Sequence, residues 1–241
     1  MTVAWETLAA TAGVALDPAA LERLRRFAGL LEAANRVTNL TRITGEAELL
    51  EKHLLDALLG APRLLGPDGA PPGSLVDVGS GGGVPGIPLA ILWPGSRVLL
   101  VESQGKKAAF LADAARELGL ERVEVACGRA EDLARGPHRE AFEAATLRAV
   151  GSVATCLELG LPFLRPGGRL LLYRGPSAAE EELALARGVA PLLGGGEPTA
   201  EPARLPSGAE RRLLLVPKAG PTPGRYPRRA GLPARSPLGS P

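Results

Sequence analysis

A glycine-rich turn carries the first chemical signal in the sequence. Gly81, Gly83 and Gly86 have the spacing G-x-G-x-x-G, and they follow a short apolar stretch, residues 74–78, that is typical of a buried strand. Glycine permits positive φ at such a turn and, having no Cβ, lets a ligand approach the main chain. The spacing alone fits dinucleotide enzymes, other nucleotide-binding proteins, and a tight turn that holds no ligand.

Two acidic residues narrow the class of ligand. Glu102 ends the next expected strand about 20 residues after the turn, where a carboxylate can bind both ribose hydroxyls of an adenosine. Asp77 lies inside the first strand, and a carboxylate there repels a pyrophosphate but attracts an ammonium or sulfonium group. S-adenosylmethionine carries both of those cations, so Asp77 favours it over NAD. Pro85 and Pro88 also depart from the usual dinucleotide pattern.

The elements that must hold these residues follow an α/β order. Helices are expected from Asp17-Pro18 onward and over about residues 46–59, and a Gly/Pro-rich linker follows. Strands and helices then alternate, which predicts a mostly parallel, doubly wound sheet with helices on both faces and a ligand at the carboxyl ends of the strands. Strands are expected at residues 74–79, 97–102, 122–127, 143–150, 168–175 and 211–218. The predicted units are a helical segment (1–72), an α/β core (73–217) and a basic, Pro-rich tail (218–241).

Composition and charge limit the class of protein. The 241 residues carry a net charge of +2, but residues 210–241 hold seven basic residues and one acidic residue. A basic tail favours an anionic macromolecular partner, or else only aids solubility; its prolines predict no regular structure. Two cysteines suit a reducing cytosol, and no signal peptide or apolar run of about 18 residues is found, so a cytoplasmic protein without membrane contact is expected. Cys and His spacings predict no metal site.

Longer motifs resemble those of a known family. They read "DVGSGGGVPGIPLAI", "VESQGKKAAFL", "GRAED", "LRAV" and "YPRRAGLPARSPL", with "NLT" and "KHLLDALL" in the helical segment. Together they are similar to the RsmG (GidB) family of small-subunit ribosomal RNA methyltransferases, over nearly the whole chain. The glycine motif with its two prolines and the "YPRR" of the tail are the specific parts.

The resemblance implies a fold, a cofactor and a substrate. It implies a Rossmann-like class I methyltransferase with a seven-stranded sheet and an N-terminal helical extension, which uses S-adenosylmethionine to methylate N7 of one guanine in a 16S rRNA loop near the decoding site. The partner would be 16S rRNA or an assembling small subunit, and the chain a monomer. The expected cofactor contacts, from the motif and from the resemblance, are Asp77, Gly79, Gly81, Val84, Glu102, Ala130, Glu131 and Arg148. Glu131, or else Asp132, could hold the adenine amino group or simply cap a helix.

Guanine N7 has an in-plane lone pair and needs no base, so no dedicated catalytic residue is expected. Arg148 and Arg174 are the expected positioning residues, through a phosphate or guanine O6, or else form surface ion pairs. The residues expected to bind RNA are Arg174, Lys218, Arg225, Tyr226, Arg228 and Arg229. Three positions depart from the family pattern: Val84 for Phe or Leu, "DAL" for "DSL" after Leu55, and Arg174 for Lys.

Two further residues and two other functions complete the predictions. Cys156 lies in a "TC" pair like that of thiolate-dependent cytosine C5 enzymes, but its apolar helix favours a buried, inert thiol. His53 is expected to be a packed helix histidine. The competing functions are a dinucleotide-dependent oxidoreductase, which the glycine spacing and Glu102 would also allow, and a non-catalytic RNA-binding factor that keeps a cofactor fold.

Overall fold

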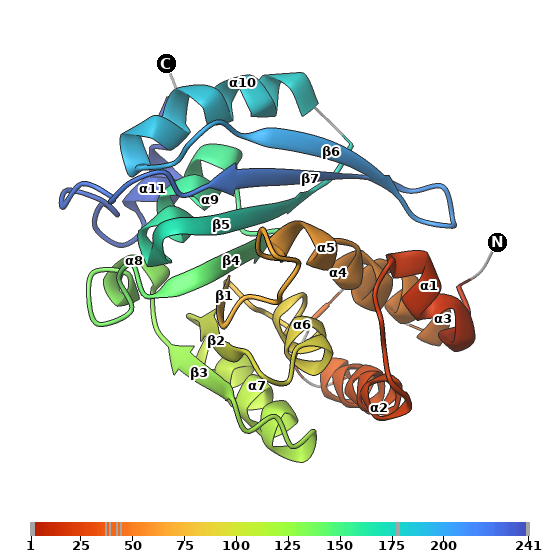
Figure 1. The fold of residues 1–241 in the computed structure, drawn as a ribbon. Coiled ribbons are helices and arrows are strands. Elements are labelled where there is room, and N and C mark those ends of the chain that lie inside the picture. The colour runs from red at the N-terminus through yellow and green to blue at the C-terminus, as the bar shows by residue number, and fades with distance from the viewer. Residues whose placement is uncertain are drawn as a thin grey trace.

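A seven-stranded sheet forms the centre of the computed structural model, which describes residues 3–36, 38, 40–41, 43, 45–176 and 179–239 (Figure 1). The strand order is β3-β2-β1-β4-β5-β7-β6. The first five of these strands are parallel, and β7 runs antiparallel to both β5 and β6. The order reverses between β1 and β4, and the mostly parallel, doubly wound sheet that was predicted is confirmed.

The strands have the bounds β1 Ser74–Val78, β2 Arg97–Glu102, β3 Val123–Cys127, β4 Phe142–Arg148, β5 Leu164–Arg174, β6 Thr199–Arg204 and β7 Glu210–Pro217. Six of them match strands expected from the sequence, and β5 begins earlier than expected. The seventh, β6, was implied only by the resemblance. It is one of the two edge strands and contains Pro202, which an edge position tolerates because one side of the strand needs no ladder donors.

Helices cover both faces of the sheet (Figure 1). Their bounds are α1 Leu8–Ala12, α2 Pro18–Asn35, α3 Glu46–Leu49, α4 Asp56–Leu59, α5 Ala61–Leu64, α6 Gly86–Leu92, α7 Gly105–Glu117, α8 Ala130–Leu133, α9 Val153–Gly160, α10 Ala179–Val189 and α11 Leu232–Arg235. Successive strand residues alternate between the faces: Leu75 packs with the N-terminal helices, α6 and α7, whereas Val76 packs with α8, α9 and α10. Among the described residues no helix combines the length and apolar character needed to cross a bilayer.

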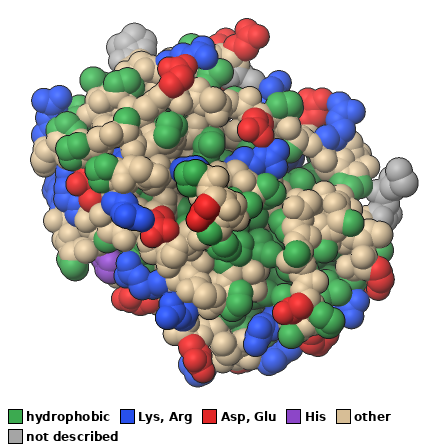
Figure 2. Space-filling model, in the orientation of Figure 1, with side chains coloured by type: hydrophobic (Ala, Val, Ile, Leu, Met, Phe, Trp, Pro, Cys, Tyr) green, Lys and Arg blue, Asp and Glu red, His purple; other side chains and the backbone are tan. Residues whose placement is uncertain are grey.

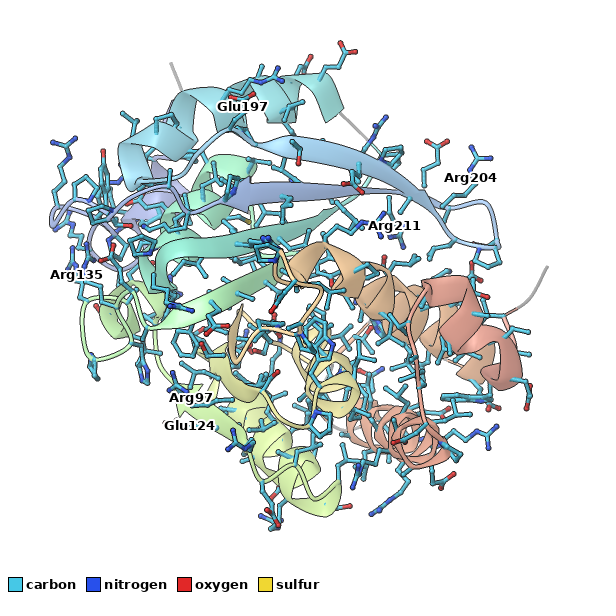
Figure 3. The ribbon with its side chains drawn as sticks, viewed as in Figure 1. Arg97, Glu124, Arg135, Glu197, Arg204 and Arg211 are labelled. Carbon is cyan, nitrogen blue, oxygen red and sulfur yellow. The ribbon has the colours of Figure 1, made fainter. Side chains whose placement is uncertain are left out.

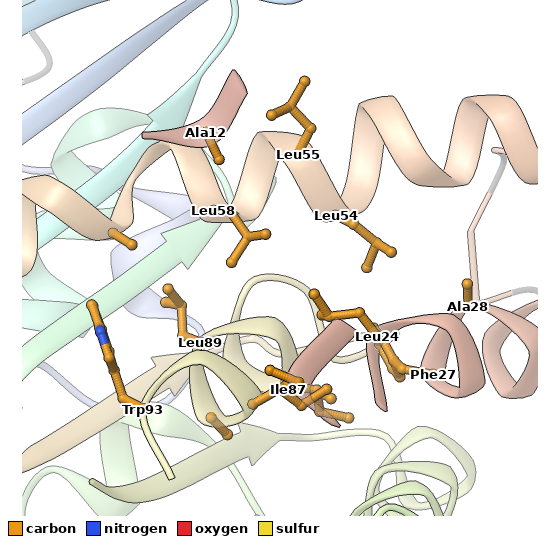
Figure 4. Packing of buried hydrophobic residues seen from close by; sticks show 14 of the residues in the cluster. Ala12, Leu24, Phe27, Ala28, Leu54, Leu55, Leu58, Ile87, Leu89 and Trp93 are labelled. Carbon is orange, nitrogen blue, oxygen red and sulfur yellow. The ribbon is translucent and has the colours of Figure 1, made fainter. Parts of the chain in front are cut away.

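The N-terminal helices pack directly on the helix that follows the glycine turn. Asp17 caps α2 by accepting a hydrogen bond from Ala20 N (2.6 Å), and Leu24 and Phe27 of α2 are fully buried. They meet Leu54, from the segment between α3 and α4, and Ile87 of α6 (Figure 4). Burial of such a side chain stabilises the fold by about 1.5–3 kcal/mol. The N-terminal segment is thereby fixed beside the end of β1.

The C-terminal segment, residues 218–239, is docked on the protein, contrary to the expectation of a tail without regular structure. It contains the short helix α11, and Thr155 Oγ1 of α9 donates to Pro233 O (3.0 Å). Arg139 donates to Tyr226 O (2.8 Å), and Arg135 donates to Pro227 O (2.7 Å; Figure 3). Prolines do exclude a long helix or a strand here, but donors from the body of the protein satisfy the backbone carbonyls instead.

Candidate functional site

Two adjoining cavities lie at the carboxyl ends of the central strands, and together they form the cleft. Both are lined by Gly79, Glu102 and Ala149. The β3-side cavity, of about 310 Å³, extends over residues 128–131 and the C-terminal segment. The helix-side cavity, of about 280 Å³, extends toward the N-terminal helices. The cleft therefore lies where a doubly wound sheet places its ligand.

The glycine turn gives the cleft a wall of bare main chain. Gly79, Gly81 and Gly83 have φ values of 76°, 55° and 86°, a region that other residues enter only with strain. A Cβ on Gly79 would lie 2.8 Å from Val150 Cγ2, which is closer than real Cβ atoms approach other carbons. Glycine is required here both by conformation and by space. Val84, another expected cofactor contact, lines the helix-side cavity.

Glu102 is fixed at the junction of the two cavities. Its Oε2 accepts a hydrogen bond from Gly81 N (2.9 Å) and its Oε1 accepts one from Gln104 N (2.8 Å). The side chain is buried, and each oxygen keeps a lone pair for a further donor. The carboxylate is thus held ready for two neighbouring hydroxyls, which is the role expected for it.

Asp77 lies behind the glycine turn and lines neither cavity. Its Oδ2 accepts a hydrogen bond from Gly86 N (3.1 Å), and its Oδ1 accepts one from Thr146 Oγ1 (2.9 Å). Burial raises the pKa of Asp77 to about 6, against the opposing effect of these hydrogen bonds. The structure therefore places the carboxylate where it holds the turn and the start of α6, and not where it would face a cationic ligand as expected.

A second carboxylate closes the β3-side cavity. Glu131 Oε1 accepts hydrogen bonds from Arg129 Nη2 (2.9 Å) and from Gly231 N (2.7 Å) in the C-terminal segment. Burial raises the pKa of Glu131, but the hydrogen bonds from Arg129, Gly231 and its own backbone, together with the charge of Arg129, outweigh that effect, and the net pKa is lowered. Its Oε2 is buried and has no partner among the described residues. Of the two expected candidates only Glu131 lines the cavity, beside Ala130, whereas Asp132 is exposed.

Arg148, at the end of β4, is held by the N-terminal helices. Its Nη2 donates to Lys52 O (2.7 Å) and to His53 Nδ1 (3.2 Å), and it pairs with Asp56 Oδ2 (3.3 Å). Arg211 of β7 donates to the other oxygen of Asp56 (3.0 Å; Figure 3). Burial raises the pKa of Asp56 in spite of the two guanidinium groups. Arg148 also lines the helix-side cavity, as its expected positioning role requires.

His53 and Thr41 line the same cavity, and sequence analysis assigned neither of them to the site. His53 lies in a wide π-helical turn, Leu50–Leu55, of a kind that occurs often at functional sites. Its Nε2 lies 2.8 Å from Thr41 Oγ1. Burial and then the charge of Arg148 lower the pKa of His53 to about 4, against a smaller effect of the Lys52 carbonyl. The signal was present in the "NLT" and "KHLLDALL" motifs, although Asn39 lies outside the described residues.

Ala149 is a further residue that the sequence did not single out. It follows Arg148, lines both cavities, and has a φ of 57° without being glycine. Such a conformation costs on the order of 1 kcal/mol and persists where the surrounding structure enforces it, often at a binding site.

Arg174 is turned away from the cleft. It forms an ion pair with Glu182 of α10, and its Nη1 donates to Gly151 O (2.7 Å). It ends β5 next to β4, as expected, but it lines neither cavity. The structure thus contains an ion pair, the alternative that the sequence left open, although this pair is partly buried and not on the surface.

Three of the residues expected to bind RNA are used inside the protein. Lys218 has no exposed side-chain surface and donates to Leu193 O (3.1 Å), and burial lowers its pKa to about 8. Tyr226 is buried. Arg228 binds both oxygens of Glu158 (2.9 and 2.7 Å), a carboxylate with no exposed surface. These side chains anchor the C-terminal segment, because buried charges must be paired within the fold.

The remaining tail cations are exposed. Arg225 stacks on the ring of Tyr226 at 5.2 Å, and Arg229 has no ion-pair partner among the described residues. On the face seen in Figure 2, basic and acidic side chains are interspersed, so that no single-sign patch dominates that face.

Cys156 is a buried thiol, and burial raises its pKa to about 11. It is protonated near neutral pH and cannot act as a thiolate nucleophile. In the part of the chain that the structure describes, no three His, Cys, Asp or Glu side chains gather as ligands for a metal ion.

Comparison with known proteins places the chain among methyltransferases. The GidB family model, described as rRNA small subunit methyltransferase G, matches residues 20–192. Proteins named ribosomal RNA small subunit methyltransferase G are similar: that of Synechococcus elongatus is 47% identical over 209 residues, covering 86% of this chain and 85% of its own, and that of Roseiflexus castenholzii is 43% identical over 232 residues, covering 96% and 97%.

Solved structures share the fold at low identity. An O-methyltransferase from Bacillus cereus in complex with SAH superposes with a TM-score of 0.57 at 19% identity, covering 89% of this chain and 100% of that one. The O-methyltransferase TomG from Streptomyces achromogenes gives 0.55 at 19% identity, covering 86% and 92%. The fold is therefore that of class I methyltransferases. With the family model matching most of its length, the chain belongs to the rRNA small subunit methyltransferase G (GidB) family.

Proposed function

We propose that this protein transfers a methyl group from S-adenosylmethionine to N7 of one guanine of 16S rRNA. The observation that carries the proposal is the pair of carboxylates in the β3-side cavity. Glu102 is held open to two hydroxyls, and Glu131 has a buried Oε2 without a partner. A buried acceptor left unpaired costs about 1–3 kcal/mol, so a ligand that donates to it binds favourably.

An adenosine fits these two groups. Glu102 would bind the ribose hydroxyls and Glu131 Oε2 the adenine amino group, and Ala130 lines the same cavity. Gly79, Gly81 and Val84 would then face the methionine end. Bound there, S-adenosylmethionine supplies an electrophilic methyl group on a sulfonium.

A dinucleotide does not fit the same turn. Dinucleotide enzymes place the pyrophosphate on free backbone N–H groups at the start of the helix after the glycines. Here Gly86 N, the first of α6, already donates to Asp77 Oδ2. The ionised Asp77 carboxylate would also repel a diphosphate at that position. The turn thus favours the methyltransferase over an oxidoreductase.

The chain's own residues need only position the base. Guanine N7 attacks through a lone pair that carries no proton, so no general base is required. A base that enters the helix-side cavity meets Arg148, His53 and Thr41, which lie next to the junction of the two cavities at Gly79. The site holds N7 in line with the methyl–sulfur bond, so that the two reactants no longer need to meet by chance in the right orientation. This alignment would be the main source of the increase in the rate of methyl transfer.

Contacts to the RNA backbone would come from cations of the C-terminal segment and of the helix-side cavity. Arg225 and Arg229 are proposed to bind phosphates, and Lys107 lines the helix-side cavity. We propose that the protein acts as a monomer in the cytoplasm, on 16S rRNA or on a partly assembled small subunit.

Methyl transfer to isolated subunits tests the proposal. Small subunits from cells lacking this gene are incubated with the protein and methyl-labelled S-adenosylmethionine, and the 16S rRNA is mapped by mass spectrometry. One 7-methylguanosine is expected at a single position. No transfer to any assembly intermediate would instead support a non-catalytic RNA-binding factor, and nicotinamide-dependent turnover would support the oxidoreductase.

A further inference from the structure

The hydroxyl group of Thr41 has a defined direction in the helix-side cavity. A threonine hydroxyl can accept two hydrogen bonds and donate one. Thr41 Oγ1 accepts from Ile43 N (3.0 Å) and lies 2.8 Å from His53 Nε2. The direction of the second contact depends on the tautomer of His53, and the neighbouring arginine decides that tautomer.

Arg148 can only donate hydrogen bonds, because a guanidinium has no acceptor. Its Nη2 points a hydrogen at His53 Nδ1 (3.2 Å), so that Nδ1 must be the unprotonated nitrogen. The lowered pKa of His53, about 4, agrees with a neutral ring near pH 7. The Lys52 carbonyl beside the ring already accepts from Arg148 Nη2 (2.7 Å), so we assign the single ring proton to Nε2, where it donates to Thr41 Oγ1.

Both acceptor positions of Thr41 are then occupied, and its own hydrogen is left to donate. No described residue accepts that hydrogen, and Thr41 lines the cavity beside His53 and Arg148. The relay from Arg148 through His53 to Thr41 thus presents one oriented donor to whatever base enters the cavity. Ile43 N, which also donates to Thr41, fixes the donor further.

We propose that Thr41 donates a hydrogen bond to O6 of the target guanine and thereby selects guanine over adenine. The proposal rests on the proposed function. On its major-groove edge guanine presents two acceptors, N7 and O6, whereas adenine presents N7 and the N6 amino donor. A donor at O6 leaves the N7 lone pair free to attack the methyl group. With adenine the same hydroxyl would face another donor and stay unpaired in the cleft.

A chemical substitution in the RNA isolates this contact. The wild-type protein and Thr41→Val are compared on small subunits reconstituted with 16S rRNA that carries either guanine or 2-aminopurine at the target position. 2-Aminopurine keeps N7 and the 2-amino group and has hydrogen in place of O6. The wild type is expected to lose roughly 10- to 100-fold in kcat/KM on 2-aminopurine. Thr41→Val should lose a similar factor on guanine but no further factor on 2-aminopurine.

Two controls separate the contact from a loss of structure. Thr41→Ser, which keeps the hydroxyl, should restore most of the preference for guanine over 2-aminopurine. Thr11→Val makes the same change in an exposed hydroxyl of α1, and it should behave as the wild type. Cofactor affinity of Thr41→Val should match the wild type, whereas its melting temperature should fall by a few degrees, because His53 Nε2 and Ile43 N lose their acceptor. Rates are therefore compared well below that melting temperature.

The outcomes distinguish this proposal from the function on which it rests. Suppose that the wild type methylates guanine but that Thr41→Val and 2-aminopurine each lower kcat/KM by independent factors that multiply. The Thr41 hydroxyl then makes no contact with guanine O6, and only the role of Thr41 is overturned. If the wild type methylates no guanine in either RNA, the proposed function is overturned, and the role of Thr41 with it.

Discussion

The two ends of the chain wall the cleft from opposite sides, and they do so in different ways. The C-terminal segment closes the β3-side cavity with Ala234 and with Gly231 N, and two of its cations, Lys218 and Arg228, turn inward to partners within the fold. The N-terminal helices close the helix-side cavity with His53, which faces the cleft as part of a relay of polar groups. Ion pairs thus stabilise the C-terminal wall, whereas the N-terminal wall presents polar side chains to a substrate. Residue type does not tell the two roles apart, because burial and partners decide them.

The largest effect on stability is expected at the ion pair between Arg228 and Glu158, which anchors the C-terminal wall. Glu158→Gln leaves Arg228 without its bidentate carboxylate in a partly buried setting, and removal of one partner of a buried pair costs roughly 3–5 kcal/mol. We expect a loss of about 3 kcal/mol in the free energy of unfolding, measured by urea denaturation at pH 7. Glu180→Gln, on the exposed first turn of α10, is the matched control. A loss below about 1 kcal/mol would show that the segment is docked by other contacts.

The second expected effect is a pH dependence of the protein's stability, caused by Asp77 behind the glycine turn. The pKa of Asp77 is raised from 3.8 to about 6, so the folded state binds more protons than the unfolded state between about pH 4 and 6. Stability from this group therefore falls as the pH rises through that window, by about 3 kcal/mol in all. Asp77→Asn cannot ionise, and its stability relative to the wild type should rise by about that amount from pH 4 to pH 7.

His53 acts in the opposite direction in the same window. Its pKa is lowered from 6.5 to about 4, so that the unfolded state binds the extra proton and stability from this group is lost as the pH falls below 6.5. The effect is common to the wild type and to Asp77→Asn, and it cancels in their difference. Parallel stability curves for the two proteins would contradict the raised pKa of Asp77.

A smaller effect is expected at the residue that both cavities share. Gly79→Ala places a Cβ 2.8 Å from Val150 Cγ2 at a φ of 76°, which moves the main-chain wall. We expect the affinity for S-adenosylmethionine to fall roughly 10-fold or more, by calorimetry. Gly95→Ala introduces the same methyl group into open space and should bind as the wild type does. Unchanged affinity in Gly79→Ala would place the cofactor outside the shared part of the cleft.

The fold was largely predictable because its signals are local. Apolar runs and helical spacing predicted six strands and the doubly wound order, and an N-cap aspartate before Pro18 predicted the start of α2. The strand β6 was not predicted from its own residues, since an exposed edge strand with Pro202 buries little and shows no apolar run. The alternation of strands and helices along the sequence thus predicted most of the sheet, whereas strand β6 was expected only from the family resemblance.

The sequence predicted where the site lies but not the direction in which its side chains point. Glu102 and Glu131 lie in the cleft as expected, because the ends of parallel strands meet at one edge of the sheet. Asp77 and Arg174 lie close by but turn toward other partners: Thr146, 69 positions from Asp77, and Glu182, eight positions from Arg174 on the next helix. Motif spacing in the sequence does not predict such side-chain pairings. The same holds for His53, whose role follows from contact with Arg148 across 95 positions of the chain.

The smallest effect tests the exposed cations of the C-terminal wall against the buried ones. If Arg225 and Arg229 contact phosphates, changing both to Ala should weaken RNA binding modestly and lower the slope of log affinity against log salt by about 0.7–0.9 for each contact. Arg204→Ala, on the hairpin of β6 and β7 at the other side of the sheet, removes an exposed cation that is paired with Glu210 (Figure 3). It should leave the slope unchanged. An unaltered slope in the double variant would mean that this wall serves the protein's own stability and that the RNA is bound from the N-terminal side alone.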